Sequence, residues 1–497
     1  MSTMRAVDAA FLAMERPHEP SHLGALMVFG PSADGPLDVA AVRAALEQRL
    51  PTMSSARRVV DGASGWSRPG WRTVDRVDLD VHLHRATIAA GADPRRALHE
   101  IVGRVHAQRL DRRRPLWQLH VVDGLGDDEI ALYAKVHMAA LDDTTGVDLM
   151  TGLLDDDPAG RPTMETVDPH PEQRHPLGSL YDRVVGPVPD QVRRSVGFPG
   201  RLAGRAARAV GDQLPGLGQT ASEVVRRWPG LEVVARLLPG DEGVDGAEHP
   251  TGRAPRLSFN EAIGPDRRFA AGTMATADLV AVKAAAAVSF HAVALATCAG
   301  SLRRWLLAND ELPSSPVVAI VPVLVGSERA EDTHVAGIML ALPTHVADPR
   351  RRLELTAANL DRAKRRQVSM PASLRQDVAM FAPPIVAALA NRLTDAMPHR
   401  RFVSPTVNLG ISNVPGPRRP VYLAGRPLRS SHPVLSVSDL TPLHLGVQAG
   451  PEVTGLGAIA DRDHVEDLIG LVDGAAVELA DLTAAFAPRS RRRTSAS

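Results

Sequence analysis

Apolar positions with a helical period mark two segments near the start of the chain. Asp38 can cap a helix that continues to Leu50, where Pro51 stops it. Asp93 followed by Pro94 is typical of an N-cap and a first helical turn. The apolar residues after Pro94 fall at i, i+3, i+4 and i+7 and so share one face: Leu98, Ile101, Val102 and Val105. We therefore expect two amphipathic helices here.

Strand patterns accompany these helices. The segment Ile130–His137 alternates, and its alternation puts Tyr133, Lys135 and His137 on one face. The segment Val317–Val325 is almost continuously apolar and predicts a buried strand, although Pro322 inside it favours an edge or a bulge. Three further segments predict strands and a last helix: 406–411, 443–461 and 465–485. Alternating helices and strands in both halves of the chain indicate an α/β protein.

The longest stretch without a charge runs from Ala284 to Leu302. Its 19 residues are long enough for a membrane span. They are mostly alanine, however, and include Ser289 and His291. We expect a buried core helix instead, within a region of two helices, residues 277–307, that is broken near Ser289.

Residues 154–252 differ from both halves, because proline and glycine are dense there. The part from Asp190 to Leu238 holds eight arginines, at 193, 194, 201, 205, 208, 226, 227 and 236, against four acids, at 190, 212, 223 and 232. Apolar residues between them predict short basic amphipathic helices. Such helices either pack on the domain surface or contact an anionic lipid surface. We expect the chain to divide into lobes at 1–153 and 253–487, a crossover linker at 154–252 and a disordered basic tail at 488–497.

Composition excludes several classes of protein. Hydrophobic residues make up 44% and charged residues 23%, which excludes global disorder. The 57 basic and 57 acidic side chains cancel, so no nucleic-acid partner is expected. One cysteine, Cys298, excludes a disulfide framework and a cysteine-based metal site. The first 20 residues lack the apolar core of a signal peptide, and we expect a cytoplasmic protein, either free or peripheral at a membrane or at lipid bodies.

Candidate chemistry is concentrated in two neighbouring stretches, RLDRRRPLWQLHVVDGL and YAKVHMAALDDTTGVDLM. In the second, His137 ends a predicted strand and Asp142 follows five residues later among small residues. A histidine of near-neutral pKa is the side chain that most often serves as a general base.

These stretches resemble the bacterial wax ester synthase/diacylglycerol acyltransferase family. That family shares a His-His-x-x-x-Asp-Gly motif with chloramphenicol acetyltransferase and peptide synthetase condensation domains. Eight segments resemble its motifs in the same order along the chain: Val7–Leu26, Leu110–Trp117, Phe259–Ala270, Ala299–Leu306, Val321–Glu328, Val335–Thr344, Asn408–Pro417 and Ala458–Leu468. The resemblance implies two chloramphenicol acetyltransferase-like lobes with a central cleft or tunnel.

The sequence departs from the family motif at the base position. His137 takes the first histidine position, Met138 the second, Asp142 the aspartate and Asp143 the glycine. In the family the second histidine is the general base, whereas a methionine has no group that takes a proton at neutral pH. The resemblance gives Asp142 an ordering role. His137 then either acts as the base or positions the loop.

A second family motif, an Asn-Asp pair that opens a helix, falls on His291 and Ala292. His291 is therefore a weaker catalytic candidate. Ser412 and Asn413 lie in a predicted turn, SNVPGP, and either bind substrate or only shape that turn.

The resemblance implies O-acyl transfer from acyl-CoA, as co-substrate, to diacylglycerol or a long-chain alcohol, which makes triacylglycerol or wax esters. It implies no metal and no tightly bound cofactor. Met138 leaves an alternative open, in which the chain is a catalytically silent paralogue that binds lipid or a partner protein.

Overall fold

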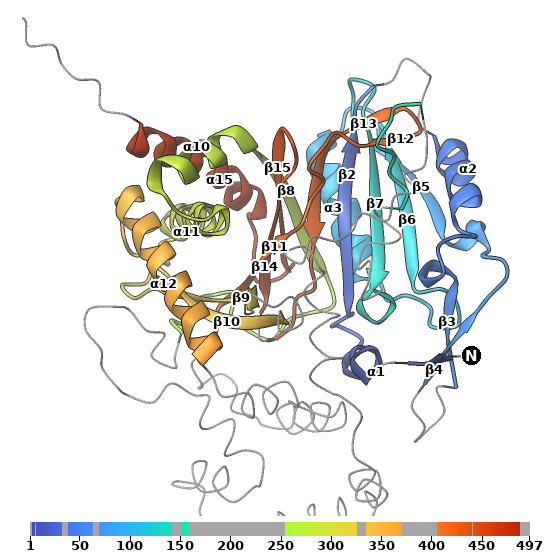
Figure 1. Ribbon diagram of the computed structural model, residues 1–497, viewed down its shortest axis with the longest axis horizontal. Coiled ribbons are helices and arrows are strands. Elements are labelled where there is room, and N and C mark those ends of the chain that lie inside the picture. The colour runs from blue at the N-terminus through green and yellow to red at the C-terminus, as the bar shows by residue number, and fades with distance from the viewer. Residues whose placement is uncertain are drawn as a thin grey trace, which may run out of the picture.

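The structure, a computed structural model, describes residues 2–4, 6–31, 38–62, 69–141, 152–159, 254–325, 334–369, 405–439 and 441–487. These residues form two α/β lobes that lie side by side, each built on a six-stranded mixed sheet (Figure 1). The expected crossover linker and basic tail fall almost entirely outside the described residues. Two of the expected motif residues, Asp142 and Asp143, also lie outside them.

The sheet of the first lobe has the strand order β12-β13-β2-β7-β6-β5. Its strands are β2 His22–Phe29, β5 Leu83–Thr87, β6 Trp117–Asp123, β7 Ile130–His137, β12 Tyr422–Leu423 and β13 Arg426–Val434. Only β5 and β6 pair in parallel; the other neighbours are antiparallel. The predicted strand Ile130–His137 is thus confirmed and lies inside the sheet, where all of its residues are buried.

Helices cover both faces of this sheet. The helix α2, Val39–Arg49, begins where the Asp38 carboxylate accepts a 2.8 Å hydrogen bond from the Ala41 amide. The helix α3, Pro94–Ala107, begins in the same way at Asp93. Both predicted helix starts are confirmed. Smaller elements lie around them: α1 Ala6–Met14, the 3₁₀ turns η1 Ser55–Arg57, η2 Leu79–Val81 and η3 Met138–Ala140, and a small sheet of β1 Ser2–Thr3, β4 Gly70–Thr73 and β3 Arg58–Asp61.

The sheet of the second lobe has the order β10-β9-β11-β14-β15-β8. Its strands are β8 Arg267–Ala275, β9 Val317–Val325, β10 His334–Leu342, β11 Leu409–Val414, β14 Leu443–Gln448 and β15 Val453–Asp461. Pro322 lies in β9, which is not an edge strand by its order. However, β9 pairs with β11 only at Ala319 and Ile320, so Pro322 lies beyond that short ladder and needs no amide there.

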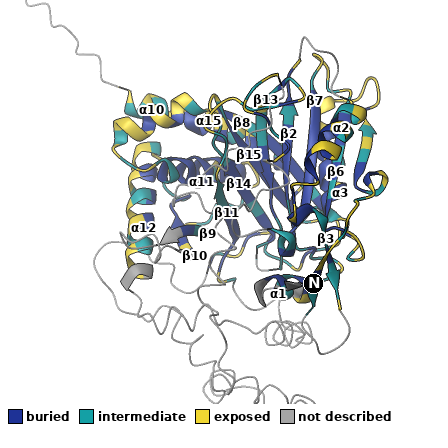
Figure 2. Ribbon diagram, turned by 45° about the vertical axis from the view of Figure 1, so that its right-hand side comes forward, coloured by how far each residue is buried: buried dark blue, intermediate teal, exposed yellow. Residues whose placement is uncertain are grey.

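In the described part of the chain, four helices pack on the outer face of the second sheet: α10 Thr276–Ala286, α11 Phe290–Ala308, α12 Pro349–Ser369 and α15 Leu468–Phe486. The predicted break near Ser289 is confirmed: Ala287 takes a left-handed conformation with φ 53°, and Ser289 caps α11. Among the described residues no single helix is both long and apolar enough to cross a membrane; α10 and α11 meet both conditions only together, as a pair bent by 109°. Most of α11 is buried in the core of the lobe (Figure 2).

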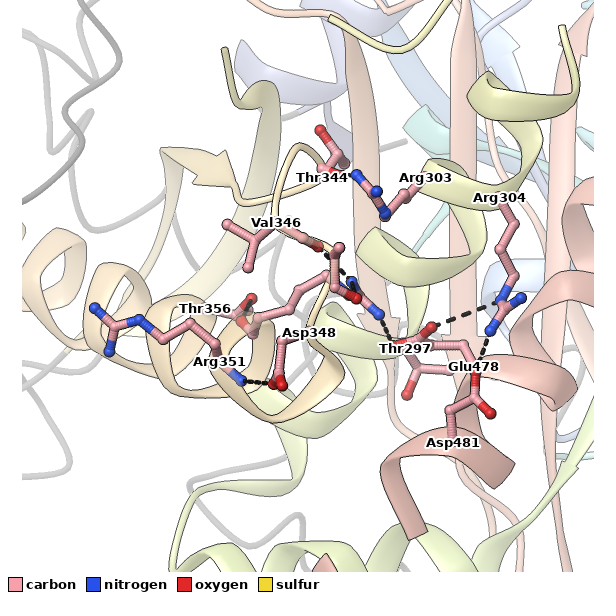
Figure 3. A network of polar contacts seen from close by, with 12 residues as sticks. Thr297, Arg303, Arg304, Thr344, Val346, Asp348, Arg351, Thr356, Glu478 and Asp481 are labelled. Atoms are coloured by element: carbon pink, nitrogen blue, oxygen red, sulfur yellow. Dashed lines mark hydrogen bonds and ion pairs between the residues drawn. The ribbon is translucent and has the colours of Figure 1, made fainter. Parts of the chain in front are cut away.

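A buried carboxylate ties these helices together. Glu478 of α15 pairs with Arg352 of α12, and Arg304 of α11 reaches both Glu478 and Asp481 (Figure 3). Gly300 of α11 makes room for this carboxylate, because a Cβ there would meet the Glu478 side chain at 2.0 Å. Burial raises the pKa of Glu478 despite its arginine partners.

Two strands and a hydrophobic core connect the two lobes. β12 and β13 belong by sequence to the range 253–487, yet they complete the sheet of the first lobe, which a division by sequence range did not foresee. β13 also packs closely on β15, because Gly455 and Gly457 bring that strand against the backbone oxygens of Ser431 and Pro433. A hydrophobic cluster from α3, β7, β8 and the end of β13 fills the space between the sheets.

Candidate active site

The strand that carries His137 ends at that residue. His137 pairs with His22 of β2, and the chain then turns into η3, where the Met138 amide donates a 2.9 Å hydrogen bond to Ser21 O. Neighbouring residues of a strand point to opposite faces, so His137 could take the place of the motif's second histidine only if the chain turned directly after Val136. The strand instead continues through His137 and turns one residue later. The Met138 side chain is half-buried.

A buried carboxylate faces this strand end. Glu15 follows α1, and its side chain is 1% exposed. Its Oε2 accepts hydrogen bonds from Arg112 at 2.6 Å and from Arg109 at 3.0 Å. Arg112 also donates to Leu12 O. The opening motif and the LDRRRPLW motif, far apart in sequence, are thus joined by ion pairs directly beside His137.

The hydrogen bonds of His137 fix its tautomer. Nδ1 accepts a 3.0 Å hydrogen bond from the Ala139 amide, so the proton of the neutral ring is on Nε2. Nε2 lies 3.7 Å from Glu15 Oε1, and Nε2 of His22 lies 3.5 Å from the same oxygen. With Nδ1 occupied and Nε2 protonated, the neutral ring has no free lone pair for an incoming hydroxyl. This geometry favours a positioning role for His137.

Burial controls the charges of this cluster. It lowers the pKa of His137 to about 4, against the attraction of the Glu15 carboxylate. Burial alone would raise the pKa of Glu15, but the interactions with His137, Arg112 and Arg109 outweigh it and leave that pKa below its ordinary value. His22 has a pKa well below its ordinary value, through burial and then Lys135. At pH 7 the site therefore holds two neutral rings and one carboxylate.

Lys135, two residues before His137 on the same face, is fully buried. Its Nζ donates 2.8 Å hydrogen bonds to Val105 O and Gln108 O, at the C-terminal end of α3. A cation at this end of a helix complements the free carbonyls there. Burial lowers the pKa of Lys135 to about 7, partly offset by Glu15. Lys135 thus anchors α3 to β7.

Ser412 and Asn413 do not lie in a turn, as the sequence predicted, but in strand β11. The strand continues to Val414 because residues 410–414 pair in parallel with β14. Ser412 Oγ lies 3.0 Å from Nε2 of His444, and Nδ1 of His444 lies 3.0 Å from Ser436 O. The two side chains in β11 point to opposite faces of the sheet. Asn413 Oδ1 is buried and has no donor among the described residues.

The remaining candidates are buried single groups. His291 lies in the first turn of α11, and burial followed by the charge of Lys364 lowers its pKa to about 4. Burial raises the pKa of the Cys298 thiol to about 12, so it is not a ready nucleophile. Within the described part of the chain, no group of three or more histidine, cysteine, aspartate or glutamate side chains could hold a metal ion.

Several residues of the site escaped the sequence analysis. Three of them, Glu15, His22 and Arg112, lie inside segments that resemble the family motifs, and Arg109 directly precedes one. Nothing in their spacing shows that they meet. His444 lies in a predicted strand and had no signal of its own, since its partner Ser412 is 32 residues away.

Comparison with known proteins decides the family. A sequence model of the wax ester synthase/diacylglycerol acyltransferase catalytic domain matches residues 4–294, and one of the family's C-terminal domain matches residues 333–483. The chain belongs to the wax ester synthase/diacylglycerol acyltransferase family. Its members are acyltransferases, and this confirms the resemblance that the motifs indicated.

Relatives and a solved structure agree with this assignment. The chain is 30% identical to a probable diacylglycerol O-acyltransferase of Mycobacterium tuberculosis, tgs2, over 97% of this chain and 99% of the relative. A second putative diacylglycerol O-acyltransferase of that organism is 31% identical, with 93% of both chains covered. The wax ester synthase/diacylglycerol acyltransferase of Marinobacter aquaeolei is 24% identical and superposes with a TM-score of 0.67, over 98% of this chain and 100% of the other. This likeness confirms the predicted fold class.

Proposed function

We propose that this acyltransferase moves an acyl group from acyl-CoA to the hydroxyl of diacylglycerol or a long-chain alcohol, and that it does so slowly. The products are triacylglycerol or wax esters. Support comes from the family, from the names of the mycobacterial relatives, and from the intact polar scaffold around His137. No tightly bound cofactor is part of the proposal.

The observation that carries the slow rate is the pair His137–Met138. Met138 stands where the family motif has its base, and its thioether takes no proton at neutral pH. His137 is buried, and its Nε2 carries the proton of the neutral ring. A general base contributes about 10²–10⁴-fold to a rate, so its loss costs about 3–5 kcal/mol of transition-state stabilisation. Binding both substrates in the correct orientation still accelerates the transfer.

The test compares wild type, His137→Ala and Met138→His with palmitoyl-CoA and a diacylglycerol. We expect slow wild-type turnover, and a rise of about 10²-fold or more for Met138→His, because the scaffold can hold the new ring. A fast wild type that His137→Ala inactivates without loss of folding would overturn the proposal and make His137 the base.

A catalytically silent paralogue is the second candidate. The departure at Met138 and that at His291–Ala292 favour it, since both lie in functional motifs while the scaffold motifs persist. An inert wild type that still binds acyl-CoA in a calorimeter, and that Met138→His activates, would support this candidate over the slow enzyme.

We further propose that the protein is cytoplasmic and contacts anionic lipid surfaces peripherally through the arginines of residues 190–238. This segment lies outside the described residues, and its charge alone supports the proposal. Each arginine near such a surface contributes about 1 kcal/mol. Flotation with phosphatidylglycerol vesicles should show binding that high salt abolishes; equal flotation at low and high salt, or none, would refute it.

A further inference from the structure

A serine and a histidine meet on the face of the second sheet that is turned towards the first lobe. Ser412 in β11 lies diagonally across from His444 in the parallel strand β14, whose direct partner is Gly410. Gly410 has no Cβ, and one placed there would meet the His444 ring at 2.7 Å. The ring therefore lies over the glycine, and its Nε2 comes within 3.0 Å of Ser412 Oγ.

The contact of His444 Nδ1 determines which atom donates in the Ser412–His444 hydrogen bond. Nδ1 of His444 lies 3.0 Å from Ser436 O, and a carbonyl can only accept. The proton of the neutral ring is therefore on Nδ1, and Nε2 must accept the proton of the Ser412 hydroxyl. A hydroxyl bonded to a histidine that a third group orients is the general signature of an activated nucleophile.

The pair lies where the two lobes meet. Ser436 belongs to the segment 435–439, which leaves β13 of the first sheet. Three residues later, the Asp439 carboxylate lies 3.6 Å from the Arg16 guanidinium. The Asp439 amide donates a 2.9 Å hydrogen bond to Glu19 Oε1. Arg16 directly follows Glu15, the carboxylate beside His137. One short segment thus connects His444 to the strand end that carries Met138. Ser412 and His444 are both only half-buried.

We propose that Ser412 is a catalytic nucleophile of this acyltransferase, with His444 as its base, and that the reaction passes through an acyl-serine ester. The inference rests on the proposed function only in taking acyl-CoA as the donor. It gives the chain a route to acyl transfer that does not use the motif position occupied by Met138.

The two half-reactions balance without another reagent. Ser412 Oγ attacks the thioester carbonyl while His444 Nε2 takes its proton; the C–S bond breaks, and His444 returns the proton to the sulfur, releasing CoA thiol. The acceptor alcohol then attacks the Ser412 ester and gives its proton to Nε2. The ester C–O bond to Ser412 breaks, and His444 returns the proton to Oγ.

Burial lowers the pKa of His444 to about 4, so the ring is neutral and its Nε2 free to accept at pH 7. A base of low pKa takes a proton less readily than one near the working pH. The route is accordingly expected to be slow.

The test measures the acylation of Ser412 separately from the complete transfer to an alcohol. Wild-type protein is mixed with palmitoyl-CoA alone, and CoA thiol release and the mass of the peptide Phe402–Arg418 are measured. We expect a burst of about one thiol per chain and a palmitoyl adduct that fragmentation places on Ser412. Ser412→Ala should abolish the adduct, and His444→Gln should slow its formation by about 10²-fold or more.

The chain supplies a matched control. Ser430 Oγ lies 2.9 Å from Nε2 of His432, whose Nδ1 is 3.3 Å from Leu456 O, so Ser430→Ala removes a similar bond outside the proposed site. It should leave the burst intact. Met138→His added to Ser412→Ala should restore transfer to diacylglycerol without an adduct, which shows that Ser412→Ala is folded.

The outcomes are distinct from those that test the proposed function. Triacylglycerol synthesis by wild type without any adduct on Ser412, or unchanged in Ser412→Ala, would overturn the acyl-serine and leave the acyltransferase standing. Loss of synthesis in Ser412→Ala and His444→Gln without an adduct in wild type would also overturn the nucleophile. A stoichiometric adduct with no transfer to any tested alcohol would support the nucleophile and contradict the proposed acceptors.

Discussion

His137 of the first lobe and His444 of the second both lie near the junction of the lobes, and the two rings have opposite tautomers. Nδ1 of His137 accepts from an amide, so its Nε2 carries the proton and faces a carboxylate. Nδ1 of His444 donates to a carbonyl, so its Nε2 accepts from a hydroxyl. Burial lowers both pKa values to about 4, and therefore basicity does not distinguish the two rings. The backbone group beside Nδ1 decides which ring can take a proton from a substrate.

The largest expected difference between the two rings is the effect of replacing each one on the rate of triacylglycerol synthesis. His444→Gln should lower triacylglycerol synthesis by about 10²-fold or more, because the only accepting Nε2 of the two is lost. His137→Gln should change the rate per folded molecule by less than about tenfold, since positioning effects are smaller than those of a base. Initial rates normalised to the folded fraction measure both, and equal losses would erase the proposed distinction.

Acid should destabilise the protein through the neutral rings. The pKa of His137 falls from 6.5 in the unfolded chain to about 4 in the fold. As pH drops from about 6.5 to about 4, the unfolded state binds a proton that the folded state does not, so stability falls with pH, by about 3 kcal/mol for this ring. In His137→Gln, the drop in the free energy of unfolding between pH 7 and pH 4, measured by urea unfolding, should be smaller than in wild type by about this amount. An unchanged pH profile would mean that the pKa of His137 is the same in the folded and unfolded states.

Glu15→Gln tests the carboxylate that distinguishes the first site from the second. It removes the negative charge that pairs with two arginines, and the free energy of unfolding should fall by about 2–3 kcal/mol. This expected loss of stability is smaller than for a fully buried ion pair, because the Arg109 and Arg112 side chains are 41% and 35% exposed. Urea unfolding at pH 7 measures the loss.

The matched control for Glu15→Gln is Asp111→Asn, whose partner Arg113 is largely exposed. An exposed pair contributes little, so the free energy of unfolding should change much less than it does in Glu15→Gln. Equal effects of the two substitutions would show that burial does not set the strength of the Glu15 network.

Gly410→Ala disturbs the second site without removing any of its polar groups. The added Cβ would lie 2.7 Å from the His444 ring, which must rotate and give up Ser412. We expect about 1 kcal/mol of lost stability, at the low end for overpacking because the ring can move, and a clear loss of rate. Gly337→Ala in β10 is the control, since its Cβ meets nothing closer than 3.5 Å. A Gly410→Ala variant as fast as wild type would show that the Ser412–His444 bond is dispensable.

Much of the fold could be predicted from the sequence because its signals are local. The capping residues Asp38 and Asp93 each start a helix as expected, since a cap needs only an amide three residues ahead. The helix break near Ser289 was also predicted, although the capping role of Ser289 was not. The end of β11 was predicted wrongly. Its last three residues read as a turn before Pro415, but the ladder to β14 keeps them extended, and β14 lies about 30 residues further along the chain.

The sequence by itself determined the family, the α/β class and the missing histidine at position 138, because motif order and residue identity are properties of the chain alone. It did not determine which histidine can accept a proton. That depends on whether an amide or a carbonyl lies beside Nδ1, as Ala139 does for His137 and Ser436 for His444. Nor did it show that Glu15 meets Arg109 or that β13 crosses into the first sheet. Such contacts join residues that are distant in sequence, so only the packing of the two lobes decides them.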